Sequence, residues 1–467
     1  MPSSYHAPHR ASAFEARAGG RAPLLDRQDR ARRRDPGIAG HGLSLVSVAG
    51  REPYHRRRLR PHNVRVTPDR ETLANPRLWL AFASMLLVSG LGNTFPIFFP
   101  ALLAEFGGSR GATASTVSFL WIGGAVLGPL SGYLVARRNP RLVVICGLGA
   151  AAAGLSVGTL ATSLPMFIGA VGIGGGIGVG FTGMVTQAAL LADVYVRRRG
   201  LAMGIAFSGS MAGYALAPLI QGAITVGGWR GALGCYVVAL VALIAWGWRV
   251  YPTRLEAPAA RAPAGGLTAP RSVGGIVASV PFWALAVVFA VPPLFGYLAT
   301  TQHALYFTAR GLSAAEASVL LAIGGLLSAS GRALAGLAAD RFGGPAAGFL
   351  SFSCSIVGML CLFGMEAWPG RLFAYGYALF LFLPLGSRAT IVSVLLSRIA
   401  PPAQYGTVFG LLSIGNSLGA AVGPWMSGWL YDVTASYVVI YLWATGLAVA
   451  GLAALSVFVV TARPPRP

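Results

Sequence analysis

Apolar stretches of 20 or more residues recur along this chain from about Leu78 onward, separated by short polar breaks. Each stretch is long enough to cross a hydrocarbon core about 30 Å thick as an α-helix. A helix also satisfies its own backbone N–H and C=O groups, as lipid requires. The sequence therefore predicts an all-α integral membrane protein with twelve transmembrane helices, at approximately 78–101, 113–136, 142–161, 165–190, 200–221, 231–251, 282–308, 316–338, 346–365, 372–396, 405–429 and 437–461.

The composition supports a membrane protein and excludes several other classes. The 467 residues are 55% hydrophobic and 11% charged, whereas about a quarter of the residues of a soluble domain are charged. The four Cys lack metal-ligand spacing, and no pairing of a nucleophile with a base stands out. The motif Gly178-x-Gly180-x-x-Gly183 follows no strand and lies within an apolar span, so it does not indicate a dinucleotide site. We expect no enzyme activity, cofactor, metal or nucleic-acid partner.

Polar segments divide the chain into five parts. Residues 1–75 are rich in Arg, Pro and Gly, and we expect a disordered tail that either contacts anionic lipid or takes no part in function. Residues 252–275, rich in Pro, Ala and Gly, predict a cytoplasmic linker. That linker separates a six-helix bundle at 76–251 from a second at 276–461, and 462–467 form a short C-terminal tail.

The distribution of Arg predicts the orientation in the membrane. All 36 basic residues are Arg, which we attribute to codon bias in a GC-rich genome. With the N-terminus inside, fifteen Arg outside the tail fall on the cytoplasmic side, and four fall on the outer side: Arg110, Arg230, Arg310 and Arg371. Because Lys and Arg are retained in cytoplasmic loops, this asymmetry predicts that both termini are cytoplasmic.

The two halves of the chain repeat one another. Five small or helix-breaking residues stand at intervals of four, five, four and five in both halves, displaced by 206 residues. These are Gly200, Gly204, Gly209, Gly213 and Pro218, matched by Gly406, Gly410, Gly415, Gly419 and Pro424. The loop GYLVARRNPR from Gly132 likewise matches GLAADRFGGP from Gly336, displaced by 204. Glycines at this spacing let helices approach closely, and a parallel six-plus-six repeat is typical of one large transporter class.

Two of these motifs carry a resemblance to a known family. GLAADRFGG at 336–344 resembles the loop signature Gly-x-x-x-Asp-Arg-x-Gly of the major facilitator superfamily, although the first-half copy has Ala136 where Asp is usual. The segment YVRRRGLAMGIAFSGSMAG at 195–213 is similar to the start of the fifth helix in the monocarboxylate and oxalate/formate branch. The resemblance covers roughly 76–461 and implies two six-helix halves that alternate access to a midplane site. It also implies that the two motif loops latch the cytoplasmic ends, through Gly132, Arg137, Gly336, Asp340 and Arg341.

Arg332 is the first candidate for binding a substrate. It lies inside the eighth predicted span, where an Arg costs roughly 2.5–3.5 kcal/mol to insert, and its guanidinium matches a carboxylate in two parallel hydrogen bonds. The alternatives are snorkelling to the inner interface or a pair with Asp340, about 12 Å further along the helix. In the monocarboxylate branch an Arg in helix 8 binds the substrate carboxylate, and Arg332-x-x-x-Gly336 matches its frame.

Two groups that handle protons in that branch are replaced here. Its proton-coupled members carry an acid one turn before the helix 8 Arg, where this chain has Ser328, and a Lys after Phe-Pro in the first helix, where it has Ile97. The resemblance therefore implies anion binding without that mechanism of proton symport.

A second intramembrane Arg and several polar residues complete the candidate site. Arg388, in the tenth predicted span, either adds a second anion-binding charge or caps carbonyls freed by Pro384. His303 could relay a proton or gate the outer vestibule, with Tyr306 close by in sequence. Further candidates for substrate contact or for bonds between helices are Asn93, Gln187 and Asn416. The glycines Gly209, Gly213, Gly415 and Gly419 are the candidates for letting the halves move.

Together these features predict a secondary active transporter of a small organic anion, such as a mono- or dicarboxylate. The coupled species would be a proton or a counter-anion, and we expect a monomer surrounded by lipid in a bacterial inner membrane. The alternatives are an efflux permease for neutral or hydrophobic compounds and a non-transporting membrane sensor. No acid stands near the middle of a predicted span, which disfavours cationic substrates.

Overall fold

The computed structural model describes residues 72–195, 198–254, 273–368 and 370–462. These residues belong to one compact unit, Arg65–Pro467. The tail predicted at 1–75 lies outside the described residues except for its last four, as do residues 255–272 of the predicted linker and 463–467 at the C-terminus.

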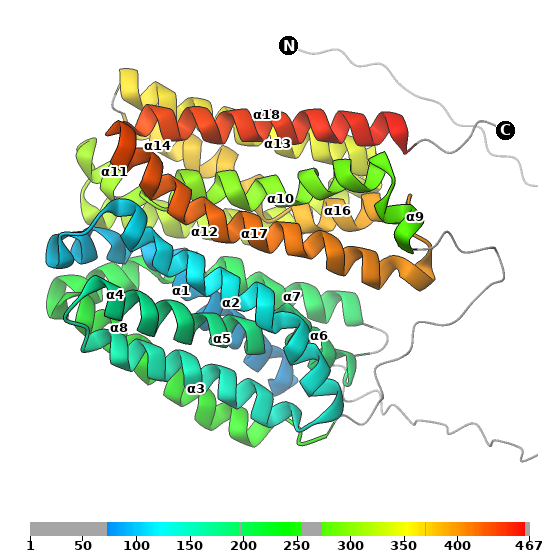
Figure 1. Ribbon diagram of the computed structural model, residues 1–467, viewed down its shortest axis with the longest axis horizontal. Coiled ribbons are helices and arrows are strands. Elements are labelled where there is room, and N and C mark those ends of the chain that lie inside the picture. Colours follow the sequence, from blue (N-terminus) through cyan, green and yellow to red (C-terminus); the bar gives the residue numbers. More distant parts are fainter. Residues whose placement is uncertain (1–71, 196–197, 255–272, 369, 463–467) are drawn as a thin grey trace, which may run out of the picture. The chain divides into compact units, whose positions relative to one another are not determined.

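All regular structure in the described residues is helical (Figure 1). The first half, residues 76–251, contains α1 (Pro76–Phe106), α2 (Arg110–Arg137), α3 (Pro140–Thr159), α4 (Leu164–Phe167), the π-helical turn η2 (Ile168–Ile173), α5 (Gly174–Thr182), α6 (Met184–Ala192), α7 (Arg199–Ala212), the 3-10 turn η3 (Gly213–Leu216) and α8 (Ala217–Val250).

The second half begins after the undescribed segment 255–272. It contains α9 (Val273–Val277), α10 (Val280–Thr300), α11 (His303–Ala309), α12 (Ala314–Phe342), α13 (Gly344–Ala367), α14 (Arg371–Tyr377), the π-helical turn η4 (Ala378–Phe382), α15 (Leu383–Leu385), α16 (Arg388–Leu396), α17 (Pro402–Thr434) and α18 (Tyr437–Thr461).

Eleven helical segments in the described residues are long and apolar enough to cross a membrane. One of them, Leu201–Val250, has 50 residues, more than twice the roughly 20 residues that one crossing needs. Its backbone leaves helical geometry at Gly228, where φ is 68° and ψ is 178°, a conformation that glycine adopts without steric cost. This break falls between the spans predicted at 200–221 and 231–251, and dividing the segment there gives twelve membrane-length helices.

The fourth and tenth crossings are both broken, and at equivalent places. The fourth passes through η2 and then breaks at Gly183, between α5 and α6. The tenth passes through η4 and α15 and then breaks at Gly386–Ser387, before α16. Ser387 lies 204 residues after Gly183, the displacement that the loop motifs show. The internal repeat predicted from sequence therefore extends to irregularities of the helices.

The repeated glycines pack helices together within each half. An added Cβ on Gly213 would collide with Gly90 of α1, and one on Gly209 would lie 3.2 Å from the carbonyl carbon of Phe82 of α1. In the second half, an added Cβ on Gly419 would lie 3.1 Å from Pro293 of α10. The first and fifth crossings, and the seventh and eleventh, thus meet through the same glycine pattern, as expected for small residues at helix contacts in lipid.

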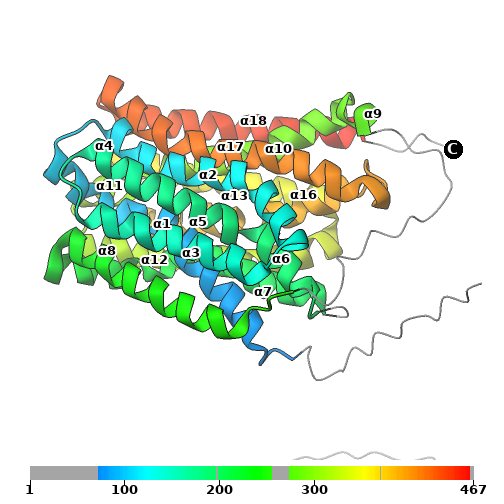
Figure 2. The ribbon, with the colours of Figure 1, turned by 60° about the horizontal axis from the view of Figure 1, so that its bottom comes forward.

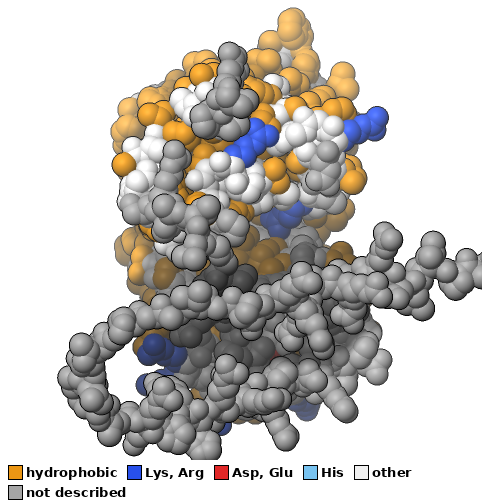
Figure 3. Space-filling view, turned by 90° about the vertical axis from the view of Figure 1, so that its right-hand side faces the viewer, with side chains coloured by type: hydrophobic (Ala, Val, Ile, Leu, Met, Phe, Trp, Pro, Cys, Tyr) orange, Lys and Arg blue, Asp and Glu red, His pale blue; other side chains and the backbone are white. Residues whose placement is uncertain are grey.

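One end of the bundle holds the start of α1 and the end of α18, and Figure 3 shows Arg side chains on this end among apolar ones. Arg77 lies at the start of α1, Arg137 at the end of α2 and Arg341 near the end of α12. Arg110 and Arg371, at the starts of α2 and α14, lie at the other end. These Arg therefore lie at the ends of the bundle to which the sequence assigned them. The end shown in Figure 3 corresponds to the predicted cytoplasmic side.

Candidate functional site

Arg332 lies in the C-terminal part of α12, and its side chain is half-buried. Its Nε donates a hydrogen bond to the carbonyl oxygen of Gly386, 3.4 Å away, at the break in the tenth crossing. No described carboxylate lies within 4.0 Å of it, and the side chain of Asp340 lies outside the described residues. Its terminal nitrogens bond to no described residue, and the planar fork that they form matches a carboxylate.

The backbone contact between α12 and the tenth crossing positions this guanidinium. An added Cβ on Gly331 would collide with the carbonyl oxygen of Leu383, and one on Gly386 with that of Ser328. The two backbones can approach this closely only because both positions are glycine. The contact brings the Gly386 carbonyl oxygen to Arg332, and it buries the Ser328 hydroxyl oxygen, which has no hydrogen-bond partner among the described residues.

Helix geometry relates the position of Arg332 to a contact that α12 makes with the first half of the molecule. Seven residues earlier on α12, Gly325 packs against the first half, where an added Cβ would lie 2.9 Å from the carbonyl oxygen of Met211 and would collide with Tyr214. Seven residues are almost two full helical turns, so Gly325 and Arg332 share one face and lie about 10 Å apart along the axis. Arg332 therefore lies on the face of α12 that meets α7 and η3 two turns earlier, while its described hydrogen bond goes to Gly386 of the second half.

Arg388, at the start of α16, is enclosed by its own half. It is 4% exposed, and its Nη2 bonds the carbonyl oxygen of Ser351 at 3.4 Å and the hydroxyl of Ser355. The guanidinium carbon lies 4.7 Å from the ring centroid of Phe295 and 4.8 Å from that of Phe352. These partners belong to α10 and α13, so the described contacts do not place Arg388 beside the first half.

The surroundings of Arg388 bear on one of the two roles that the sequence allowed, while the other, as a second anion-binding charge, stays a prediction. Its carbonyl partner, Ser351, belongs to α13, so it is not a carbonyl that Pro384 frees. Nε and Nη1 are buried without a hydrogen-bond partner among the described residues, and no described carboxylate forms an ion pair with it. Two aromatic faces provide the attraction that the cation receives. Among the described residues, no carboxylate therefore balances this guanidinium in the interior of the second half.

Asn93 connects the two halves near the middle of the bundle. It is 1% exposed, and its amide nitrogen donates to the carbonyl oxygen of Ser210 in α7, 2.7 Å away. Its Oδ1 accepts a 3.1 Å hydrogen bond from the hydroxyl of Tyr297 in α10. The ring of Trp121, in α2, lies 5.9 Å from that of Tyr297 between centroids. This polar contact between halves makes Asn93 a member of the candidate site.

Gln187 and Asn416 form bonds within one half. Gln187 donates to the carbonyl oxygen of Thr182 at 3.1 Å and accepts from the hydroxyl of Tyr251 at 3.4 Å, both in the first half. Asn416 donates to the carbonyl oxygen of Phe289 at 3.0 Å, joining α17 to α10. The described contacts therefore favour the helix-joining role that the sequence left open for both residues.

His303 and Tyr306 are buried in the second half. The Nε2 of His303 lies 2.9 Å from the carbonyl oxygen of Ala317, and its Nδ1 lies 3.4 Å from the hydroxyl of Tyr377. A proton on Nε2 alone satisfies both contacts, since Nδ1 can accept from the Tyr377 hydroxyl. Tyr306 donates to the carbonyl oxygen of Leu362 at 3.0 Å. These contacts hold the imidazole among other groups of the second half.

The motif loops are described only in part. An added Cβ on Gly132 would lie 2.7 Å from Val185, and the exposed Arg137 donates to the Tyr133 hydroxyl at 3.2 Å. Arg341 is exposed at the end of α12. The backbones of Gly336 and Asp340 lie in α12, but the side chain of Asp340 lies outside the described residues. A cytoplasmic latch through Asp340 stays a prediction.

Among the residues that join the halves, sequence reasoning missed Tyr297 and Gly325 near the candidate site. Tyr297 resembled a packing or interfacial aromatic, and Gly325 was one of many glycines in an apolar span. Nothing in the local sequence marks either residue, because their partners Asn93 and Tyr214 come from the other half.

The family model described as Major Facilitator Superfamily matches residues 80–391. The chain belongs to this superfamily, and it is a multi-pass membrane transporter rather than an enzyme. It is similar to monocarboxylate transporter 13 of Bos taurus, at 27% identity over 379 residues that cover 79% of this chain and 86% of that protein. Monocarboxylate transporter 11 of Homo sapiens is 27% identical over 395 residues, covering 80% and 81%.

A solved structure shares the fold. The crystal structure of a D-xylose-proton symporter matches with a TM-score of 0.65 and covers 82% of this chain and 96% of that chain, at 17% identity. Identity this low supports the architecture and carries no information on substrate. The comparisons confirm the predicted superfamily and the similarity to the monocarboxylate branch.

Proposed function

We propose that this protein moves a small organic anion, such as a mono- or dicarboxylate, by alternating access. The observation that carries the proposal is the half-buried guanidinium of Arg332, whose terminal nitrogens have no described partner. A charge inside a membrane helix is costly and indicates a functional site. A planar guanidinium matches a carboxylate in two parallel hydrogen bonds, and the names of the relatives agree with such a substrate.

The polar contact between halves supplies a plausible second part of the site. Asn93 and Tyr297 lie on opposite halves and form a hydrogen bond with each other. When the halves move apart, this bond would break, and its polar groups would become available to a substrate held by Arg332. Such sites lie near the midplane between the repeats of this transporter class. Arg388 contributes a positive field from within the second half, and its described contacts give it no direct place beside the substrate.

The coupled species is better supported as a counter-anion than as a proton. Ser328 stands one turn before Arg332 and carries no titratable proton, and both ring nitrogens of His303 are engaged by groups of the second half. The surroundings of Arg332 therefore lack the acid that a proton-coupled mechanism needs at this position. The proposed location is a bacterial inner membrane, for which the all-arginine composition is the support.

Uptake into proteoliposomes across a panel of labelled mono- and dicarboxylates tests the proposal. We expect saturable uptake that is stimulated by carboxylate loaded inside and is largely insensitive to a pH gradient. Arg332→Gln should lose at least about a hundredfold in uptake efficiency, because charge-assisted hydrogen bonds contribute about 1.5–3 kcal/mol each. If Arg332→Ala and Arg388→Ala both leave uptake intact, the anion model is wrong and export of neutral compounds becomes the better reading.

A further inference from the structure

The outer ends of α2 and α17 meet across the two halves of the molecule. Figures 1 and 2 both show α2 alongside α17, and the two helices are in direct contact. The carboxylate of Asp432, near the end of α17, accepts two hydrogen bonds from the start of α2. Oδ1 accepts from the backbone N–H of Arg110 at 2.9 Å, and Oδ2 from that of Gly111 at 2.8 Å.

The backbones touch at the same place. An added Cβ on Gly428 would collide with the carbonyl oxygen of Arg110 and would lie 2.5 Å from the nitrogen of Gly111. An added Cβ on Gly111 would lie 3.1 Å from the nitrogen of Trp429. Two glycines, one from each half, therefore allow Asp432 to reach the first backbone N–H groups of α2.

The side chain of Arg110 adds contacts to three elements of the second half. Its Nη1 donates to Oε1 of Gln302 at 2.6 Å and to the hydroxyl of Tyr437 at 2.7 Å. Its guanidinium carbon lies 3.4 Å from the ring centroid of Tyr431. Gln302 in turn donates to the carbonyl oxygen of Ser427 at 2.8 Å. The second half thus holds both the backbone and the side chain at the start of α2.

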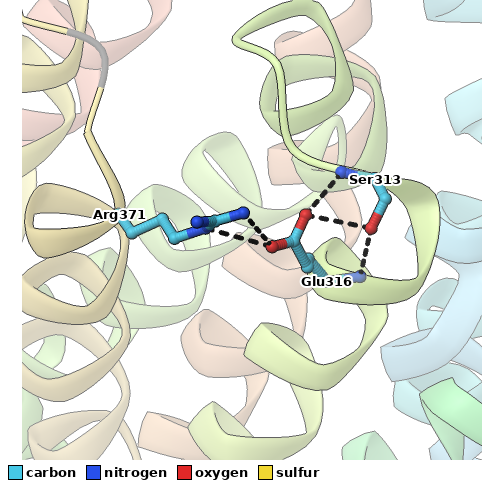
Figure 4. A network of polar contacts seen from close by, with 3 residues as sticks. All are labelled: Ser313, Glu316 and Arg371. Carbon is cyan, nitrogen blue, oxygen red and sulfur yellow. Dashed lines mark hydrogen bonds and ion pairs between the residues drawn. The ribbon is translucent and has the colours of Figure 1, made fainter.

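The internal repeat shows what is unusual about this helix start. The equivalent helix of the second half, α12, closes its N-terminus with its own residues in a capping box: Ser313 accepts from the backbone N–H of Glu316, and Glu316 accepts from that of Ser313 (Figure 4). Arg371 also bonds Glu316 from the same half. Displaced by 204 residues, Ser109 stands in place of Ser313, but Ala112 stands in place of Glu316.

Helix α2 therefore has half of a capping box. Ser109 accepts from the backbone N–H of Ala112 at 3.1 Å, but no carboxylate follows it within the first turn. The acidic group is supplied instead by Asp432 of the opposite half. A carboxylate at a helix N-terminus satisfies N–H groups that have no partner within the helix and interacts favourably with the helix dipole.

We propose that Asp432 is an outer latch, which caps α2 in trans and is engaged only while the outer side is closed. Opening that side must separate α2 from α17, which exposes the N–H groups of Arg110 and Gly111 and releases Arg110 from Gln302 and Tyr437. The latch therefore biases the conformational equilibrium toward the outward-closed state. This inference uses the alternating access of the proposed function but does not depend on a carboxylate substrate.

Spin-label distance measurements test the latch without any substrate. Labels on Thr162→Cys and Thr308→Cys, both exposed near the outer end, report the separation of the halves in the full-length protein with its four native Cys replaced by Ser. We expect a mainly short distance in the parent protein. Asp432→Ala should raise the ratio of the long-distance to the short-distance population by about fivefold to tenfold, the effect of losing one N-terminal cap together with its dipole interaction.

Glu316→Ala is the matched control. It removes a capping carboxylate of the same kind from α12, whose described partners all lie in the second half, so the distance distribution should not change. Asp432→Asn keeps one acceptor oxygen and nearly the same shape, and it should give an intermediate shift. It also provides the test if the alanine variant fails to fold. An unchanged distribution in both Asp432 variants, or an equal shift in Glu316→Ala, would overturn the proposal.

Restoring the missing residue of the repeat gives an independent test. Ala112→Glu supplies a capping carboxylate from within α2 and places a second negative charge beside Asp432, so it should also favour the long distance. In the Asp432→Ala background the repulsion is absent, and Ala112→Glu should then add little. An increase in the short-distance population by Ala112→Glu alone would contradict capping in trans.

Discussion

The hydroxyl of Tyr297 donates a 3.1 Å hydrogen bond to Oδ1 of Asn93 and thereby joins α10 of the second half to α1 of the first. Because Asn93 is also bonded to the backbone of Ser210, it is held in the orientation that receives the tyrosine. This bond lies in the interior of the molecule, where a hydrogen bond is stronger than in water.

The bond between Tyr297 and Asn93 should be measurable as a coupling. We expect Tyr297→Phe to lower the free energy of unfolding by about 1 kcal/mol. Asn93→Ala should lower it by more, because it also leaves the carbonyl oxygen of Ser210 without its hydrogen-bond donor. The double variant should lose less than the sum, by about 0.5–1.5 kcal/mol. Unfolding of the four proteins in detergent measures this, and strictly additive losses would show that the two side chains do not interact.

Arg332→Lys should separate the charge of the guanidinium from its shape. Lysine keeps the positive charge but offers a point charge in place of a planar fork. We expect KM for a carboxylate to rise by about tenfold with a smaller change in maximal rate, since one charge-assisted bond is lost and the other kept. Arg398→Lys, at an exposed site near the end of the tenth crossing, is the control and should leave both parameters unchanged.

Arg388→Met should stabilise the protein. The buried guanidinium has two nitrogens without partners among the described residues, and replacing buried ionic groups by well-packed apolar side chains of similar volume is often neutral or stabilising by about 1–4 kcal/mol. We expect a higher thermal unfolding midpoint and a loss of substrate affinity much smaller than that of Arg332→Gln. Complete loss of uptake in a well-folded variant would instead place Arg388 in contact with the substrate.

Gly325→Leu should block transport while Gly410→Ala should not. A side chain at Gly325 would collide with Tyr214 across the two halves, whereas an added Cβ at Gly410 would meet no atom within 4 Å. Overpacking of this kind typically costs about 1–3 kcal/mol. Here it would destabilise the state in which α12 and η3 are in close contact. Uptake and the spin-label distances together measure the effect, and normal uptake by Gly325→Leu would refute the close approach.

His303→Phe should affect stability but not the pH profile of transport. The aromatic replacement keeps the packing against Phe307 and Tyr377 but leaves the carbonyl of Ala317 without its donor, at a cost of about 1–3 kcal/mol. Because both ring nitrogens are engaged in contacts within the second half, we expect no step of uptake to depend on protonation of the imidazole. Uptake measured between about pH 5 and 8, where histidines normally titrate, should keep its shape. A flattened profile would restore the proton-relay role.

Much of the architecture follows from local properties of the chain. The length and apolarity of each stretch predict the helices, and the repeat of Gly209 and Gly213 as Gly415 and Gly419 predicts two related halves. Even the break at Gly228 falls where a polar interruption separates two apolar runs. Apolar stretches in lipid must form helices, because an unpaired backbone group in hydrocarbon costs several kcal/mol.

The faces of the helices were not predictable in the same way. A helix that is apolar all round gives no periodic pattern to distinguish lipid, its own half and the opposite half. The sequence therefore identified Arg332 by its cost in the membrane, but it treated Asn93, Gln187 and Asn416 alike. Only the tertiary structure separated them, by giving Asn93 a partner in the other half.

By itself, the sequence determined the membrane class, the helices, the repeat and the charged residue that most needs a functional explanation. The tertiary structure alone decided what each polar group bonds to. Asp432 was simply an acid near a helix end until its carboxylate was seen to bond the first N–H groups of a helix more than 300 residues earlier. Helix formation depends on neighbours along the chain, whereas capping in trans and packing between halves depend on residues that only folding brings together.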